Sequence, residues 1–190
     1  MGKQLIISVG REFGSGGHVI AEELARRFEL PLYDNNLLEH IAEEKEISHE
    51  SLKKYDERPK NRLFSRTVRG YSNSMQENLA NMQFDYLKKK AAAGESFVIV
   101  GRCSETILKG FDGLVTIFVL GDPDVKAERI RKVYGVSEEE ARRMMKREDW
   151  NRKSYHNYYC KGTWGDSRNY DFSINSSRLG IDGTVTMLEE

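Results

Sequence analysis

A glycine-rich loop between an apolar run and an amphipathic segment constrains the fold of this chain most strongly. The run "QLIISV" (4–9) predicts a buried strand, because it is short, apolar and rich in β-branched residues. The loop "GREFGSGG" (10–17) follows it, and residues 18–28 then place apolar side chains at helical spacing. A buried strand, a glycine loop and a helix in this order are typical of parallel α/β proteins.

Four further apolar runs extend this pattern along the chain. They are "LYD" (32–34), "SFVIVGR" (96–102), "LVTIFVLGD" (114–122) and "YDFSIN" (170–175). Helical signals separate them, among them the helix-start pairs Asp122–Pro123 and Ser137–Glu140. With 190 residues the chain is long enough for one well-buried core. We therefore predict a single α/β domain (1–190) with a five-stranded parallel sheet, helices on both faces and right-handed crossovers.

Charge and composition exclude several classes of function. The basic and acidic residues each number 30, so no net field favours nucleic acid or an anionic membrane as the main partner. No apolar run approaches the ~20 residues that span a bilayer, and no signal peptide is recognisable, which predicts a cytoplasmic protein. Cys103 and Cys160 show no metal-binding spacing. They are expected to be free thiols in a reducing compartment, without a disulfide scaffold or a zinc site.

The glycine loop predicts an anion site. At a helix N-terminus, the backbone N–H groups of Gly14, Ser15, Gly16 and Gly17 would favour a phosphate, together with the helix dipole. A tight turn without a ligand is the simpler alternative, because glycine also suits unusual backbone angles. A dinucleotide loop, as in oxidoreductases, would need a third glycine where this chain has Val19. A P-loop would need a lysine where it has Gly17.

Taken together, five segments resemble the cytidylate kinase-like branch of the P-loop nucleoside monophosphate kinases over nearly the full length of the chain. They are, in order, "ISVGREFGSGGHVIAEELARRFELPLYD", "FVIVGR", "LVTIFVLGDP", "KREDWNRKSYHNYY" and "YDFSINSS". The resemblance implies a three-layer α/β/α kinase fold with a mobile substrate-binding insertion (44–72) and an arginine-bearing lid (140–168). It also implies transfer of the γ-phosphoryl group of ATP, with Mg²⁺, to a nucleoside monophosphate. Such a transfer needs positioning and charge neutralisation more than a general base.

The resemblance assigns roles to residues at the two expected binding sites. The loop residues Gly14 to Gly17 would bind the donor phosphates. Arg102 would match the arginine of the family's "GR" motif and pair with the phosphate or base of the acceptor. Asp34 would lie at the mouth of the acceptor site. From the residues alone, Asp34 is equally suited to cap the helix that follows it.

Two arginines of the predicted lid, Arg147 and Arg152, would close on the transferring phosphoryl group, supported by Asp149. They belong to a segment rich in both basic and acidic residues. Without the resemblance, such a charge run is more often a solvated helix face. Trp150 in the same segment has helical spacing and is predicted to pack.

The departures from the family pattern concern both substrates. Gly17 replaces the P-loop lysine, and a glycine cannot supply a positive charge to the donor phosphates. Arg11 inside the loop, or His18 at the first turn of the helix, would have to supply it. On the acceptor side, His40 and Cys103 replace an arginine and an aspartate of the cytidylate kinases proper, which weakens the case for CMP itself.

Three hypotheses therefore stay open. The first is an ATP-dependent kinase that works through backbone amides and arginines and whose small phosphorylated acceptor is expected to be a nucleotide. The second is a nucleotide-binding module that has lost catalysis. The third, remote one is a dinucleotide-binding oxidoreductase. The sequence assigns no Mg²⁺ ligand, and it leaves open whether the chain forms a homodimer.

Overall fold

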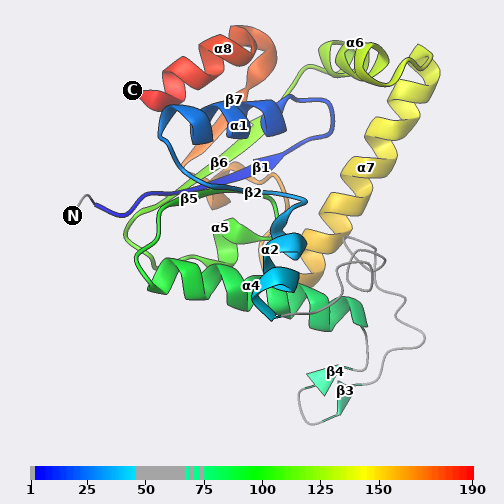
Figure 1. Ribbon diagram of the computed structural model, residues 1–190. Helices are drawn as coiled ribbons and strands as arrows, with labels where there is room; N and C mark the ends of the chain where they lie inside the picture. Colours follow the sequence, from blue (N-terminus) through cyan, green and yellow to red (C-terminus); the bar gives the residue numbers. More distant parts are fainter. Residues whose placement is uncertain (1–2, 46–66, 69–70, 73–74) are drawn as a thin grey trace.

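The computed structural model describes residues 3–45, 67–68, 71–72 and 75–190. Its centre is a five-stranded parallel sheet with the strand order β2-β5-β1-β6-β7 (Figure 1). The strands are β1 (Ile6–Arg11), β2 (Leu32–Tyr33), β5 (Phe97–Val100), β6 (Leu114–Leu120) and β7 (Phe172–Asn175). All five strands that the sequence predicted are present, and the predicted α/β class is confirmed.

Helices cover both faces of this sheet. On one face lie α1 (Gly17–Arg27) and α8 (Ser176–Glu189), and on the other lie α2 (Leu37–Lys45), α4 (Met75–Ala92) and α5 (Ser104–Ile107) (Figure 1). The remaining elements are α6 (Pro123–Tyr134), α7 (Glu138–Tyr159), a 3₁₀ turn (Ser167–Asn169) and a small antiparallel hairpin of β3 (Thr67–Val68) and β4 (Tyr71–Ser72).

Each face of the sheet has its own apolar core, because the side chains of a strand alternate between the two faces. Ile7 and Val9 of β1 pack with α1 and α8 through residues such as Leu24 and Val185. Ile6 packs on the opposite side, in a cluster made with α2, α4 and α5. The central strands are mostly apolar for this reason, as expected for a parallel sheet that is covered on both faces.

The long helix α7 begins at a predicted signal and crosses the carboxyl ends of the strands. Ser137 caps it, with its side-chain oxygen accepting from the N–H of Glu140. In Figure 1 α7 runs from the end of α6 to the neighbourhood of α4. The residues through which it meets the rest of the chain recur at intervals of three or four and therefore lie on one face. They are Ala141, Met145, Asp149, Arg152 and His156.

Two other predictions from the sequence are not confirmed: one is wrong, and the other lies largely outside the described residues. Trp150 has 60% of its surface exposed, so the prediction that it packs was wrong. It lies half a helical turn from the contact face of α7, where helical spacing alone gives no burial. The predicted insertion (44–72) lies largely outside the described residues, which include only the end of α2 and the small hairpin from it. Within the described part of the chain, no helix has the length and apolar character needed to cross a membrane.

Candidate active site

The glycine loop joins β1 to α1 in the conformation that a phosphate loop needs. Gly14 and Gly16 have φ values of +82° and +81°, a left-handed region that glycine enters without a steric penalty. Gly16 is the N-cap of α1 and offers no side chain to the first N–H groups of the helix. The Gly17 N–H donates to the Ser15 side-chain oxygen at 3.3 Å, while the N–H groups after it and the helix dipole together favour an anion at this end of α1.

Several contacts hold the carbonyl oxygens of the loop. The Ser176 hydroxyl donates to the Ser15 carbonyl oxygen at 2.5 Å, and Arg129 Nη1 donates to the Gly14 carbonyl oxygen at 2.5 Å. The Ser15 hydroxyl donates to the carbonyl oxygen of Glu12 at 2.8 Å. Because a peptide unit points its N–H away from its C=O, fixing these carbonyls also fixes the direction of the loop amides.

An ion network supports the loop from α6 and α7. The ammonium group of buried Lys126 lies 2.8 Å from Glu12 Oε2 and 3.8 Å from Asp149 Oδ2. Asp149 Oδ1 accepts from the backbone N–H of Phe13 at 2.6 Å. Burial raises the pKa of Asp149, against the opposing effects of the Phe13 N–H and of Lys126. Asp149 therefore joins α7 to the loop backbone, and the nearby charge of Arg152 also acts on its carboxylate.

Arg11 fills the space that a side chain at position 17 would need. A Cβ atom added to Gly17 would lie 2.5 Å from Arg11 Cβ, closer than real Cβ atoms approach, and 3.2 Å from Val119 Cβ, which is a tight contact. At the other end of the arginine, a Cβ added to Gly101 would lie 2.5 Å from Arg11 Nη1. The Arg11 side chain therefore lies between two glycines, and a lysine at position 17 is incompatible with it.

This packing shows a relation to the P-loop motif that the sequence analysis missed. In G-x-x-x-x-G-K, the first glycine and the lysine are six positions apart. With Gly16 as the second glycine, Arg11 stands at the first glycine position and Gly17 at the lysine position. The basic residue and the glycine have exchanged places. Both residues were visible in the sequence, but only the structure shows that the two positions are in contact.

Two cavities open on either side of Arg11. The first, here called the loop pocket, has a volume of about 810 Å³. Its walls are Arg11, Glu12, Phe13, Gly14, Gly16, Gly17, His18, Asn35, Arg129, Ile130, Val133, Tyr134 and Arg152. It contains most of the glycine loop and one face of α6.

The second cavity, here called the strand-end pocket, has a volume of about 740 Å³ and lies beyond the carboxyl ends of β1 and β5. Its walls are Gly10, Arg11, Gly101, Arg102, Cys103, Glu105, Glu148, Asn151, Arg152, Tyr155, His156, Trp164 and Tyr170. Ligands of open α/β sheets bind at this edge. Arg11 and Arg152 line both cavities, and Arg152 Nη1 donates to the Arg11 carbonyl oxygen at 3.1 Å.

The turn after β5 has an unusual backbone. Gly101, Arg102 and Cys103 have φ values of +74°, +60° and +56° in succession. For the two residues with a Cβ this conformation costs on the order of 1–3 kcal/mol each, and such strain clusters at functional sites. The Ser104 hydroxyl supports the turn by donating to the Gly101 carbonyl oxygen at 2.7 Å, and it accepts from Ser8. The turn aims the buried Arg102 into the strand-end pocket.

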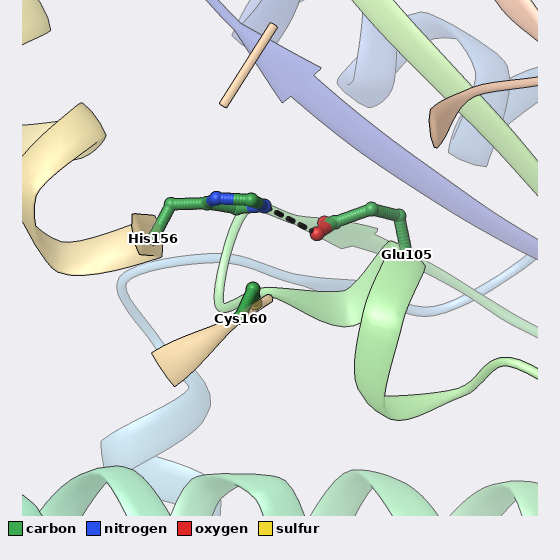
Figure 2. A group of neighbouring side chains, drawn as sticks. All are labelled: Glu105, His156 and Cys160. Carbon is green, nitrogen blue, oxygen red and sulfur yellow. Dashed lines mark hydrogen bonds and ion pairs between the residues drawn. The ribbon is translucent and has the colours of Figure 1, made fainter. Parts of the chain in front are cut away.

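A buried polar cluster lies at one end of the strand-end pocket (Figure 2). His156 Nε2 lies 2.7 Å from Glu105 Oε1, and Cys160 lies beside both. Burial disfavours the imidazolium form, but the contacts with Cys160 and Glu105 outweigh it and raise the pKa of His156 to about 10. The contact between the two thiols lowers the pKa of Cys160 and raises the pKa of Cys103. Neither Cys103 nor Cys160 forms a disulfide in the structure.

The predicted site residues do not all gather at these cavities. Gly14, Gly16, Gly17, His18, Arg11, Arg102 and Arg152 line one or both of them. Ser15 is buried within the loop. Asp34 lies just outside the loop pocket, where its Oδ2 is 3.3 Å from His18 Nε2 and its Oδ1 accepts from the N–H of Asn36. Arg147 is exposed and pairs with Glu148 at 2.8 Å, on the face of α7 that points away from both cavities.

A parallel sheet of this strand order, with a glycine loop between its first strand and helix and arginines over its strand ends, defines the class of P-loop phosphotransferases. Crystal structures of two shikimate kinases have this fold. The enzyme from Bacteroides thetaiotaomicron superposes with a TM-score of 0.56 at 16% identity, covering 97% of this chain and 96% of that one. The enzyme from Acinetobacter baumannii gives 0.53 at 10% identity, with 98% and 91% covered.

Residues 6–178 match the cytidylate kinase-like family, and the chain belongs to that family. A crystal structure of an uncharacterized protein from Eubacterium ventriosum ATCC 27560 is similar at 38% identity and a TM-score of 0.78, covering 98% of this chain and 96% of that one. The search among curated proteins found no match. The family suspected from the sequence is thereby confirmed.

Proposed function

We propose that this protein transfers the γ-phosphoryl group of ATP to a small phosphorylated acceptor, and that the acceptor is a nucleoside monophosphate or a close analogue. The observation that supports this best is the exchange of Arg11 and Gly17. A loop kept only as a turn has no need of a basic residue in place of the lost lysine. Here the aliphatic stem of Arg11 fills the space that position 17 leaves empty, its guanidinium lies against Gly101, and the residue lines both cavities.

The loop pocket is the proposed donor site. Its backbone amides and the N-terminus of α1 would bind the phosphates of ATP, with His18 beside them. Val133 and Tyr134 provide an exposed apolar wall against which a base can lie. Mg²⁺ would arrive with ATP and supply charge neutralisation. The P-loop hydroxyl that usually binds this ion is replaced by His18, and the Asp34 carboxylate next to His18 is the group we assign to it.

The strand-end pocket is the proposed acceptor site. Arg102 is buried at its wall and would pair with the phosphate of the acceptor, because a guanidinium binds phosphate in a bidentate manner. Trp164 and Tyr155 offer aromatic surface to a base. Cys103 stands where cytidylate kinases proper have an aspartate, so the base is read by a different set of side chains.

Arg11 and Arg152 lie where the two proposed substrates would meet. Charge that develops on the transferring phosphoryl group is stabilised by positive groups already fixed in place. Arg152 is fixed by its bond to the Arg11 carbonyl and by stacking on Phe13, with 5.5 Å between its Cζ and the ring centroid. Arg147 keeps its proposed lid role only if region 140–168 turns toward the cavities when substrates bind.

An acceptor panel tests the proposal. The purified chain is incubated with ATP and Mg²⁺, and ADP release is measured with CMP, dCMP, UMP, AMP, GMP or no acceptor. We expect release that depends on one of the monophosphates and is lost in Arg11→Ala. Arg143→Ala, a surface arginine paired with Glu139 and Glu140, is the matched control and should behave as wild type. ATP binding without acceptor-dependent release across the panel would favour a nucleotide-binding module instead.

A further inference from the structure

We propose that Glu105, His156 and Cys160 form a binding site for a divalent cation of the zinc type. One ligand atom from each residue lies within 4.8 Å of the other two. The three come from α5, from α7 and from the residue that ends α7, and Figure 2 shows them converging on one point. Within the described residues, no other group of three potential ligands is this close.

The distances suit such an ion after a small adjustment. Around a tetrahedral Zn²⁺, bond lengths of about 2.0–2.3 Å place neighbouring ligand atoms roughly 3.3–3.8 Å apart. His156 Nε2 and Glu105 Oε1 are now 2.7 Å apart, because they share a hydrogen bond, and the widest pair is no more than 4.8 Å. The His156 and Glu105 atoms must move apart, and the widest pair of ligand atoms must move closer together. Side-chain rotations that displace these atoms by about an ångström are enough. No movement of the helices is required.

Outer contacts already orient two of the three ligands. Asn157 Oδ1 accepts from the backbone N–H of Trp164 at 2.9 Å and lies 3.2 Å from His156 Nδ1. An amide oxygen can only accept, so Nδ1 bears a proton and Nε2 is the atom that faces the cluster. The Thr106 hydroxyl donates to Glu105 Oε1 at 2.9 Å. Metal sites in proteins typically have such second partners behind their ligands.

Burial and access also favour a cation. The side chains of His156 and Glu105 are only 6% and 4% exposed, and Cys160 is buried as well. Ionisable groups are rarely buried to this degree unless they pair with each other or bind an ion. The cluster is still reachable, since Glu105 and His156 form part of the wall of the strand-end pocket.

The ligand types select the class of ion. One thiol, one imidazole and one carboxylate make a mixed set that suits Zn²⁺ and is foreign to Mg²⁺, which takes oxygen ligands. Three protein ligands leave the fourth tetrahedral position for water or for a group in the pocket. This site is separate from the Mg²⁺ expected at the loop pocket. It requires no nucleotide, so it stands whether or not the chain is a kinase.

The test uses the tag-free full chain, freed of metal by chelation and kept reduced with a thiol-free phosphine. Co²⁺ is titrated as a spectroscopic substitute for Zn²⁺. We expect one equivalent to bind with a thiolate-to-cobalt charge-transfer band, and Zn²⁺ to displace it. In metal sites, loss of a residue that only supports a ligand typically costs about 10–100-fold in metal affinity. Loss of a ligand itself should cost more, so we expect Cys160→Ser and His156→Gln to lower the Co²⁺ affinity by at least about 100-fold.

Cys103 provides the matched control. It is buried against Cys160 but does not belong to the group of three ligands. Cys103→Ser should therefore keep the charge-transfer band. Absence of the band in the wild-type chain would overturn the proposal, even if a variant fails to fold. Loss of the band in a folded Cys103→Ser chain, or its survival in Cys160→Ser, would overturn the assignment of the ligands.

Discussion

The loop pocket and the strand-end pocket are built from different parts of the chain. The phosphate-facing side of the loop pocket is backbone, shaped by Gly14 and Gly16 and oriented through carbonyls that Ser176 and Arg129 hold. The strand-end pocket is lined by side chains from the turn after β5, from α7 and from the loop that contains Trp164. A backbone site persists while side chains change, whereas a side-chain site changes with each substitution. Family membership therefore says more about the donor than about the acceptor.

Removing the charge shared by both pockets should have the largest effect. Arg11→Ala leaves the glycine loop without a basic residue at the transferring group, and we expect kcat/KM to fall by about 1,000-fold, as when a comparable arginine is lost. That corresponds to about 4 kcal/mol of transition-state stabilisation. Steady-state kinetics with the acceptor found in the panel measures it. Unchanged kinetics would show that Arg11 serves the packing around Gly17 only.

Exchanging the residues at positions 11 and 17 tests whether the loop pocket needs only a basic side chain, or needs that side chain at position 11. Gly17→Lys alone places a Cβ 2.5 Å from Arg11 Cβ, and we expect an overpacking cost of about 1–3 kcal/mol in the free energy of unfolding. Adding Arg11→Gly removes the clash and restores G-x-x-x-x-G-K. Urea unfolding should then return toward wild type, with more turnover than Arg11→Ala. A double variant no better than Gly17→Lys would contradict the compensated exchange.

A third test distinguishes the roles of Arg147 and Arg152, which both belong to α7. Arg152 lines both cavities, whereas Arg147 lies on the outer face of α7. We expect Arg152→Ala to lower kcat by about 100-fold with little change in KM, as for a group that acts in the transition state. Arg147→Ala should have a smaller effect, and Arg143→Ala none. Equal losses for Arg147→Ala and Arg152→Ala would mean that α7 turns during the reaction.

Arg102→Lys should affect the strand-end pocket alone. A lysine keeps the charge but loses the bidentate contact, and it must also adopt the φ of +60° found at this position. We expect the KM for the acceptor to rise about 10-fold, in the range of a charged hydrogen bond. The affinity for an ATP analogue, measured by calorimetry without acceptor, should stay the same. A weaker affinity for ATP would show that the two pockets do not separate donor from acceptor.

The smallest effect concerns the support of the loop. Because burial raises the pKa of Asp149, the folded state binds a proton there more tightly than the unfolded state does. Its contribution to stability is complete below about 3.8, the unfolded value, and is lost as pH rises through the folded value. The stability of wild type relative to Asp149→Asn should therefore decline as the pH rises above the unfolded pKa of Asp149 and through its folded pKa. Urea unfolding at several pH values would show no trend if the carboxylate were solvated.

The sequence predicted the fold well because the fold depends on patterns. The apolar runs of β1, β5 and β6 and the caps of α6 and α7 are local signals, and each led to the right element. The predictions failed or stopped where distant residues meet. Trp150 has the spacing of a packed residue, but only the position of α7 decides which of its faces is covered.

The residues of the candidate site also fall into two groups: those that a local sequence pattern predicted and those that only contacts between distant residues reveal. The loop residues were found from their glycines, and Arg102 from its place after a strand. Glu105, Lys126 and His156 were not singled out, because their partners lie 51 to 114 positions away in the sequence. The two cysteines were judged by their spacing, which says nothing about a contact made between the turn after β5 and the end of α7.

One stripe of α7 contacts the walls of both pockets. Asp149 binds the loop backbone, Arg152 binds the carbonyl of Arg11, and His156 binds Glu105 at the strand-end pocket. If the two pockets bind the proposed donor and acceptor, a shift of this helix caused by one substrate would be transmitted to the site of the other. Occupancy of the two pockets is then linked by a coupling free energy. Linkage requires that the factor by which donor changes acceptor affinity equals the factor in the opposite direction.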